Sequence, residues 1–303
     1  MSSPPEPSVR PAGVIHDLGY RPYAGPRLGE GPVAWSFFLT GLRNTYGLGR
    51  SARSKVLPMG LLGLMLLPAL ILVGVLVQAK DLLDLDEQIV AYSTYPITTQ
   101  LLVSVFVASQ APALISRDLR FSTITLYLAR PMRRSVYVLV RVASLTVATF
   151  ILVVAPLLLM YVGGLLADLP LARETGRFLA AGVGALLLAA CLAGPAAVVA
   201  ALTIRRGLAV AAVIVVLLVS YTVVATIQGI AFDSDNLAVG EVAGIFSPYT
   251  LVNGVQVFLF DSPEATTTPP DSTAMGVLYC VATVVVVLGS LGILLARYRR
   301  IRS

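Results

Sequence analysis

Long apolar stretches, separated by short segments that carry the charges, dominate this sequence. Six stretches are at least 21 residues long and contain at most one charged residue each. They are Leu57–Ala79, Pro96–Ser116, Val136–Val162, Phe178–Ile204, Gly207–Phe232 and Ala274–Ala296. Because an α-helix rises about 1.5 Å per residue, each stretch can cross a hydrocarbon core of about 30 Å. The pattern predicts an all-α, polytopic membrane protein with six transmembrane helices.

The charges between these stretches sort by sign. Of the 22 Lys and Arg residues, 19 fall on the face that holds both ends of the chain, and Lys80, Arg173 and Arg177 fall opposite. Of the 16 Asp and Glu residues, 12 fall on that opposite face. Short segments rich in Lys and Arg stay in the cytoplasm when a protein inserts. We therefore expect cytoplasmic termini and a multi-pass protein of a bacterial-type cytoplasmic (inner) membrane.

The composition agrees with a membrane protein and argues against other classes. The chain is 57% hydrophobic and only 13% charged, unlike a soluble domain. Its net charge of +6 reflects topology, and no basic patch is interleaved with stacking aromatic residues, so no nucleic-acid partner is expected. Cys191 and Cys280 fall at different depths of their stretches, so neither a disulfide nor a metal site is expected.

The segment before the first apolar stretch has two parts. Residues 1–31 contain six prolines and no apolar core, so we expect a cytoplasmic tail rather than a signal peptide. In residues 32–56, Trp35, Phe38, Leu42 and Tyr46 recur at spacings of three and four, on one face of a helix. This pattern predicts an amphipathic helix anchored in the cytoplasmic interface of the lipid bilayer. Packing of the helix on a soluble partner is the alternative.

Groups for catalysis or ion coupling are missing from the apolar stretches. Intramembrane proteolysis needs paired His residues, buried Asp residues or a Ser–His pair, and none can be assembled. The chain has no Gly-rich phosphate loop ending in Lys–Ser or Lys–Thr, so we do not expect it to hydrolyse ATP by that route. Ion-driven carriers need ionisable groups inside the membrane. Arg141 is the one such group, and it can snorkel to the cytoplasmic interface.

A stripe of small residues marks the fourth stretch. Such a stripe lets another helix approach closely, and the approaching helix can belong to this chain or to a second subunit. The stripe consists of Ala181, Ala185, Ala189, Ala193 and Ala197.

The segment of residues 117–135, between the second and third stretches, combines arginines with a helical pattern. Phe121, Ile124 and Leu128 share one face of a short helix, and Arg130 and Pro131 end it. The arginines alone would fit a topological anchor. A short amphipathic helix that projects from a bundle is also suited to a groove on a partner.

With this segment, the chain resembles the permease subunits of type-2 ABC exporters. The resemblance covers residues 33–303 in layout and is most specific over Ser116–Arg141, which is similar to the family's coupling segment. Asp118 matches the family's acidic position and Arg130–Pro131 its helix-ending turn, whereas Ser122 stands where the family usually has Gly.

The resemblance implies partners and a function. It implies two ATP-binding subunits that carry the ATP and Mg²⁺, and a second permease subunit in a homodimer or heterodimer. Nearly charge-free spans favour an apolar or amphipathic cargo such as a lipid, peptide or drug. A secondary transporter or channel, and a non-transporting scaffold or sensor, are the alternatives. The implied ATPase interface consists of Arg117, Asp118, Arg120, Phe121, Ser122, Ile124, Leu128, Arg130 and Arg133.

A second uncharged run, Gly244–Phe260, lies in the long segment before the last stretch. Its 17 residues are interrupted by Pro248 and Asn253, so it is marginal as a span. A seventh span would also move the C-terminal arginines to the outer face, against the charge rule. We therefore predict a re-entrant or interfacial outer hairpin over residues 244–260. The resemblance implies an outer gate at Pro248, Tyr249 and Asn253. The predicted transmembrane domain is residues 57–303.

Overall fold

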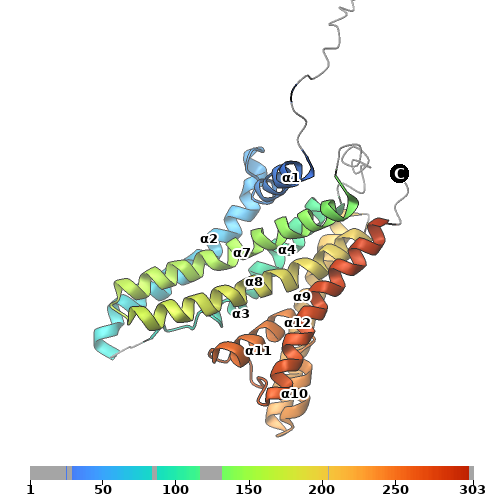
Figure 1. Ribbon diagram of the computed structural model, residues 1–303. Coiled ribbons are helices and arrows are strands. Elements are labelled where there is room, and N and C mark those ends of the chain that lie inside the picture. The colour runs from blue at the N-terminus through green and yellow to red at the C-terminus, as the bar shows by residue number, and fades with distance from the viewer. Residues whose placement is uncertain (1–24, 26–28, 84–86, 117–131, 204, 300–303) are drawn as a thin grey trace, which may run out of the picture.

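A computed structural model describes residue 25 and residues 29–83, 87–116, 132–203 and 205–299, which form a helical bundle (Figure 1). The helices are α1 (Glu30–Thr45), α2 (Ala52–Leu83), α3 (Tyr95–Thr98), α4 (Gln100–Leu114), α7 (Arg134–Leu166), α8 (Leu171–Leu202), α9 (Arg206–Asp233), α10 (Leu237–Gly244), α11 (Pro248–Phe260) and α12 (Thr273–Arg299).

Five helices are long and apolar enough to cross a membrane, namely α2, α7, α8, α9 and α12. They coincide with five of the six predicted spans, so the prediction of a multi-pass, all-α membrane protein is confirmed at this level. The pair α10 and α11 counts as a sixth candidate if it is taken as one span, although the two helices meet at an angle of 109°.

The remaining predicted span, residues 96–116, does not form one long helix. The short helix α3 ends at Thr98, and Thr99 has the non-helical angles φ −102° and ψ 14°. The following helix α4 has 15 residues, which is about 22 Å at 1.5 Å per residue. It contacts α2, α7, α8 and α9, and most of its side chains are buried. A helix that is apolar on all sides belongs in the centre of a bundle.

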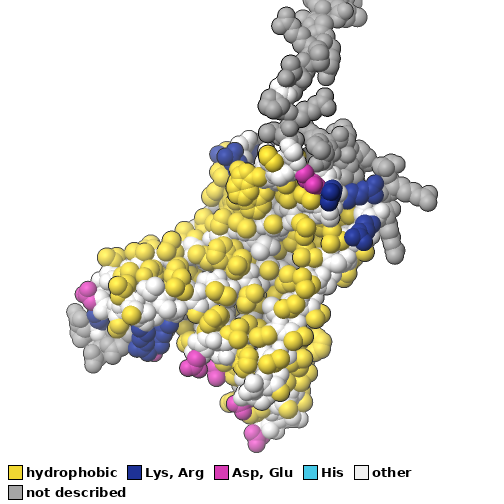
Figure 2. Space-filling model, viewed as in Figure 1, with side chains coloured by type: hydrophobic (Ala, Val, Ile, Leu, Met, Phe, Trp, Pro, Cys, Tyr) yellow, Lys and Arg dark blue, Asp and Glu magenta, His cyan; other side chains and the backbone are white. Residues whose placement is uncertain are grey.

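The core lies around α4, α7 and α8. In the most apolar part of α8, 61% of the residues are buried, against 17% in α2 and 22% in α9 and α12. The alanine stripe of α8 is buried throughout. Its partners are therefore helices of the same chain. The outer helices expose large apolar side chains such as Leu70, Val219 and Val285, and Figure 2 shows an apolar surface along the bundle.

The charged side chains gather at two opposite ends of the bundle. At the first, which we call the basic end, the starts of α1 and α7 meet through Glu30 and Arg133, close to the end of α12. At the second, the acidic end, Lys80 donates a hydrogen bond to the carbonyl of Asp168. Figure 2 shows acidic groups along the lower edge of the molecule, which is the acidic end. The separation of basic from acidic residues along the sequence therefore corresponds to two opposite ends of the helical bundle.

Two arms separate towards the acidic end. One contains α7 and α8 and the other α9 and α12, and α11 lies between them in Figure 1. Glycines let α11 approach both arms. A Cβ atom added to Gly184 of α8 would lie 2.1 Å from Cδ of Gln256 on α11. A Cβ atom added to Gly276 of α12 would lie 2.1 Å from the ring of Phe258 on α11. The helix is therefore fixed in the fork by close packing.

Candidate functional site

The predicted coupling segment lies almost wholly outside the described residues. This applies to Arg117, Asp118, Arg120, Phe121, Ser122, Ile124, Leu128 and Arg130. The residues that flank it are described and buried at the basic end. Ser116 donates a hydrogen bond to the carbonyl of Ala200, and Met132 belongs to the core. Both residues that flank the undescribed part of the segment are therefore held in the bundle at the basic end.

Arg133, the last predicted interface residue, is described and bound to α1. Its backbone N–H donates to Oε1 of Glu30 at 2.9 Å, and its Nε atom lies 3.7 Å from Oε2. The side chain of Arg133 is 82% exposed, so the ion pair itself contributes little stability. The carboxylate of Glu30 also sits at the start of α7, where the helix dipole favours negative charge. This contact ties α1 to the end of the coupling segment.

The four predicted anchor residues do not share one environment. Trp35 is 62% exposed and stacks on Phe38, with ring centroids 5.4 Å apart. Leu42 is half-buried, and Tyr46 is buried and donates a hydrogen bond to the carbonyl of Ala148 at 2.7 Å. Only the first half of the stripe is thus available to a membrane interface, because the second half packs into the bundle.

Helix α1 also covers Arg141 of α7. The guanidinium of Arg141 lies 4.2 Å from the ring centroid of Phe37 and 5.5 Å from that of Tyr137. Arg141 is only 6% exposed, and whether its guanidinium reaches the cytoplasmic interface stays a prediction. Cation–π contacts of this kind contribute about 0.5–2 kcal/mol each. The contact with Phe37 stabilises α1 against α7 at the basic end, whereas the contact with Tyr137 lies within α7.

The three predicted gate residues lie on α11, where Tyr249 and Asn253 are buried and Pro248 is half-buried. Pro248 begins α11, and Tyr249 and Asn253 are each 1% exposed. The hydroxyl of Tyr249 donates to the carbonyl of Gln100 at 3.0 Å and lies 2.8 Å from Oγ of Ser104. These bonds connect α11 directly to the central helix α4. Whether the residues gate a pathway stays a prediction.

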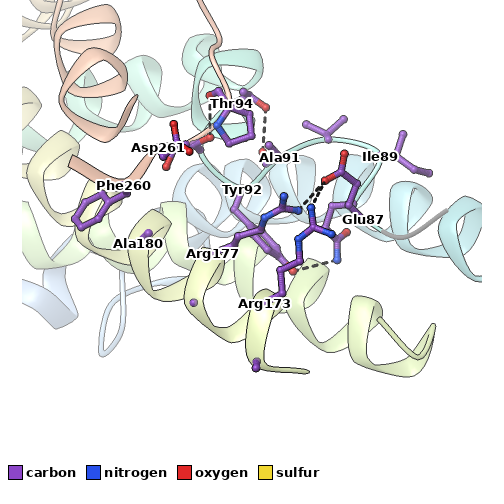
Figure 3. Close-up of a pocket in the computed structure, with 17 residues that line it drawn as sticks. Glu87, Ile89, Ala91, Tyr92, Thr94, Arg173, Arg177, Ala180, Phe260 and Asp261 are labelled. Atoms are coloured by element: carbon purple, nitrogen blue, oxygen red, sulfur yellow. Dashed lines mark hydrogen bonds and ion pairs between the residues drawn. The ribbon is translucent and has the colours of Figure 1, made fainter. Parts of the chain in front are cut away.

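A cavity of about 730 Å³ opens at the acidic end, between the start of α8 and the end of α11 (Figure 3). Glu87, Arg173, Arg177 and Asp261 line it, together with the segment of residues 88–94. Oε2 of Glu87 lies 2.9 Å from Nη1 of Arg177 and 3.4 Å from Nη2 of Arg173. Both signs of charge therefore line this cavity.

Behind this cavity lies a carboxyl group that sequence reasoning missed. Glu174 is fully buried, and its Oε2 accepts hydrogen bonds from the Tyr92 hydroxyl at 2.5 Å and from Nε2 of Gln88 at 3.2 Å. Its Oε1 has no partner among the described residues. Burial, and then the Glu174 carboxylate, raise the pKa of Tyr92 above its usual range. The sequence does carry one indication of this burial. Glu174 lies seven residues before Ala181, so both side chains are on the same face of α8.

A second cavity, of about 590 Å³, lies at the basic end and has a different character. It is formed by the turn before α2, the first turns of α2 and α9, and the last turn of α4. Arg50, Arg53 and Arg206 line it, and no Asp or Glu is among its lining residues, all of which lie in the described part of the chain. The sequence alone shows these arginines only as part of the positive charge on one face, because their convergence depends on the fold.

Comparisons with known proteins do not identify the chain. No protein-family model matches it, and no significantly similar curated protein is found. Among the described residues, no group of three or more His, Cys, Asp or Glu side chains is placed to hold a metal ion. The function is therefore inferred from the fold, the two cavities and the sequence pattern.

Proposed function

We propose that this protein is the transmembrane permease subunit of an ATP-driven ABC exporter. It would move an apolar or amphipathic substrate out of the cytoplasm or the inner leaflet. The observation that carries the proposal is the place of the connection between α4 and α7. Ser116 and Met132, which flank the predicted amphipathic segment, are buried at the basic end, and the positive-inside rule assigns this end to the cytoplasm. An ATPase on the cytoplasmic side would meet the segment there.

The interior of the bundle supports transport without an ion gradient. Of the described charged residues, only Arg141 and Glu174 are buried, and they lie near opposite ends. The middle of α4, α7 and α8 is closely packed with apolar and small side chains. The cavity of about 730 Å³ at the acidic end and the cavity of about 590 Å³ at the basic end, separated by a packed centre, suit a protein that opens alternately to its two sides.

A continuous set of contacts could carry motion from the ATPase to the acidic end. The coupling segment is joined directly to α4 and α7, and Glu30 ties α1 to the start of α7. At its other end, α4 holds α11 through Gln100 and Ser104. Movement of α4 would thus be transmitted to the fork in which α11 sits. The complex would contain two ATP-binding subunits and a second permease subunit.

Co-purification with the ATPase subunit tests the proposal. The double substitution Phe121→Asp and Leu128→Asp places charges on the apolar face of the coupling segment and should release the ATPase subunit while the spans still insert. Thr123→Asp with Leu126→Asp adds the same charge to the opposite face and serves as the matched control. If the first double variant retained the ATPase subunit as well as the control does, the proposed interface would be wrong.

Glu174 favours a second candidate, a proton-coupled secondary transporter. Ionisable groups inside a membrane bundle are costly and mark functional sites, and Glu174 is fully buried with one oxygen that has no partner among the described residues. Transport into vesicles that contain this chain alone separates the two candidates. Uptake driven by a pH gradient without any ATPase subunit, and abolished by Glu174→Gln, would favour the secondary transporter.

A further inference from the structure

The cavity at the basic end concentrates positive charge from three separate segments. Arg50 precedes α2, Arg53 lies in the first turn of α2, and Arg206 begins α9. The guanidinium group is always charged and binds phosphate oxygens through paired N–H groups. The fold therefore brings together three groups of the type that recognises phosphate.

Two helix starts add to this positive character. The first turns of α2 and α9 both line the cavity, and each helix has more than 25 residues. Backbone N–H groups at a helix start lack partners within the helix, and the helix dipole is positive there. Both effects favour a bound anion. They act in the same direction as the arginines.

The walls of the cavity change from polar to apolar. Gln110 and Ser109 of α4 are buried and present an amide and a hydroxyl, whereas Leu57, Pro58 and Pro112 present only carbon. Leu57 is also 44% exposed and belongs to the apolar surface of α2. A ligand with its head group among the arginines could therefore lay a hydrocarbon tail along α2.

We propose that this cavity binds an amphiphile with an anionic phosphate head group, drawn from the cytoplasmic leaflet. The assignment rests on the proposed function, since it names the substrate class that the exporter would move. It reconciles a cationic cavity with nearly charge-free spans, because only the head group of the ligand carries charge. Free phosphate would use the arginines but not the apolar wall.

Lipid binding to the purified, full-length chain tests this assignment without any ATPase subunit. Native mass spectrometry would follow titration with dioleoyl phosphatidylglycerol, and with dioleoyl phosphatidylcholine as the zwitterionic control. We expect preferential binding of phosphatidylglycerol. Each arginine removed should weaken it about tenfold, so Arg53→Gln with Arg206→Gln should weaken it about a hundredfold. Arg43→Gln with Arg205→Gln removes two exposed arginines outside the cavity and should leave the affinity unchanged.

Three results would overturn the assignment. The first is equal binding of both lipids, or no effect of the cavity variant. The second is displacement of the lipid by glycerol phosphate at the same concentration, which would point to recognition of phosphate alone. The third is a cavity variant that keeps the lipid and loses the ATPase subunit, which would make the arginines a protein-docking surface. If the wild-type chain itself failed to bind phosphatidylglycerol while the ATPase subunit still co-purified, the ligand would be wrong and the exporter proposal would stand.

Discussion

The hydroxyl of Tyr92 is the closer of the two donors that hold the buried Glu174 carboxyl group. Its oxygen lies 2.5 Å from Oε2 of Glu174, whereas Nε2 of Gln88 lies 3.2 Å away. Tyr92→Phe removes this donor and keeps the ring, which contacts Phe178 edge-on with centroids 6.2 Å apart. Because the hydroxyl also accepts a hydrogen bond from Nε2 of Gln88 at 3.0 Å, the substitution tests both of these bonds with little change in packing.

The expected loss follows from burial at both ends of the bond. Tyr92 is 3% exposed and Glu174 is fully buried, so water cannot replace the missing donor. Hydrogen bonds to charged groups contribute about 1.5–3 kcal/mol, and we expect Tyr92→Phe to lower the free energy of unfolding by about 2 kcal/mol.

Tyr161→Phe is the matched control, because it removes a hydroxyl that lies 2.9 Å from Oγ1 of Thr175 in a half-buried, neutral pair. A loss of about 0.5–1 kcal/mol is expected there. The free energies would come from unfolding in mixed detergent micelles. Equal losses for Tyr92→Phe and Tyr161→Phe would refute the reasoning.

The same bond predicts a dependence on alkaline pH. Burial and Glu174 raise the pKa of Tyr92, so its folded value lies above the unfolded value of about 10. The stabilisation is fully present below pH 10 and is lost as the pH rises through the folded pKa. Between pH 9 and 11, the wild type should therefore lose more stability than Tyr92→Phe. Parallel curves for the two proteins would contradict this shift in pKa.

Three further predictions concern topology and the fork. A cysteine at Ser303 should be shielded from an impermeant thiol reagent in intact cells while one at Ser234 reacts, and the reverse labelling would refute the orientation. Asn253→Lys places a charge at a site that is 1% exposed and should abolish transport but not membrane insertion, and a loss of insertion would indicate a true span. Gly184→Val should displace Gln256 and lower the melting temperature, whereas Gly182→Val, with open space around its Cβ position, should not, and equal effects would contradict the close packing of α11.

Length and polarity were sufficient to predict most of the fold. A membrane span needs about 20 apolar residues, and five stretches of that kind became single helices. Their ends were harder to predict. Helix α8 starts at Leu171 rather than Phe178, because Glu174 finds Tyr92 and Gln88 as partners inside the bundle. Such partners come from distant segments and leave no local pattern.

The candidate sites depend even more on contacts across the chain. The break at Thr99 has no Gly signal, and it accompanies a hydrogen bond from the Tyr95 hydroxyl to the carbonyl of Met65 on α2. The sequence places Arg141 near one end of its apolar stretch, and only the fold shows that α1 covers it. The convergence of Arg53 and Arg206 on one cavity likewise joins residues that are far apart in sequence.

The most direct test of the exporter proposal is ATP hydrolysis by the complex reconstituted in lipid vesicles. The complex of this chain with its ATPase subunit should hydrolyse ATP faster in vesicles that contain phosphatidylglycerol than in phosphatidylcholine alone. Phe121→Asp with Leu128→Asp should abolish this stimulation, and Thr123→Asp with Leu126→Asp should retain it. Full stimulation in the Phe121 and Leu128 double variant, with the ATPase subunit still bound, would contradict the proposal that this segment couples the two proteins.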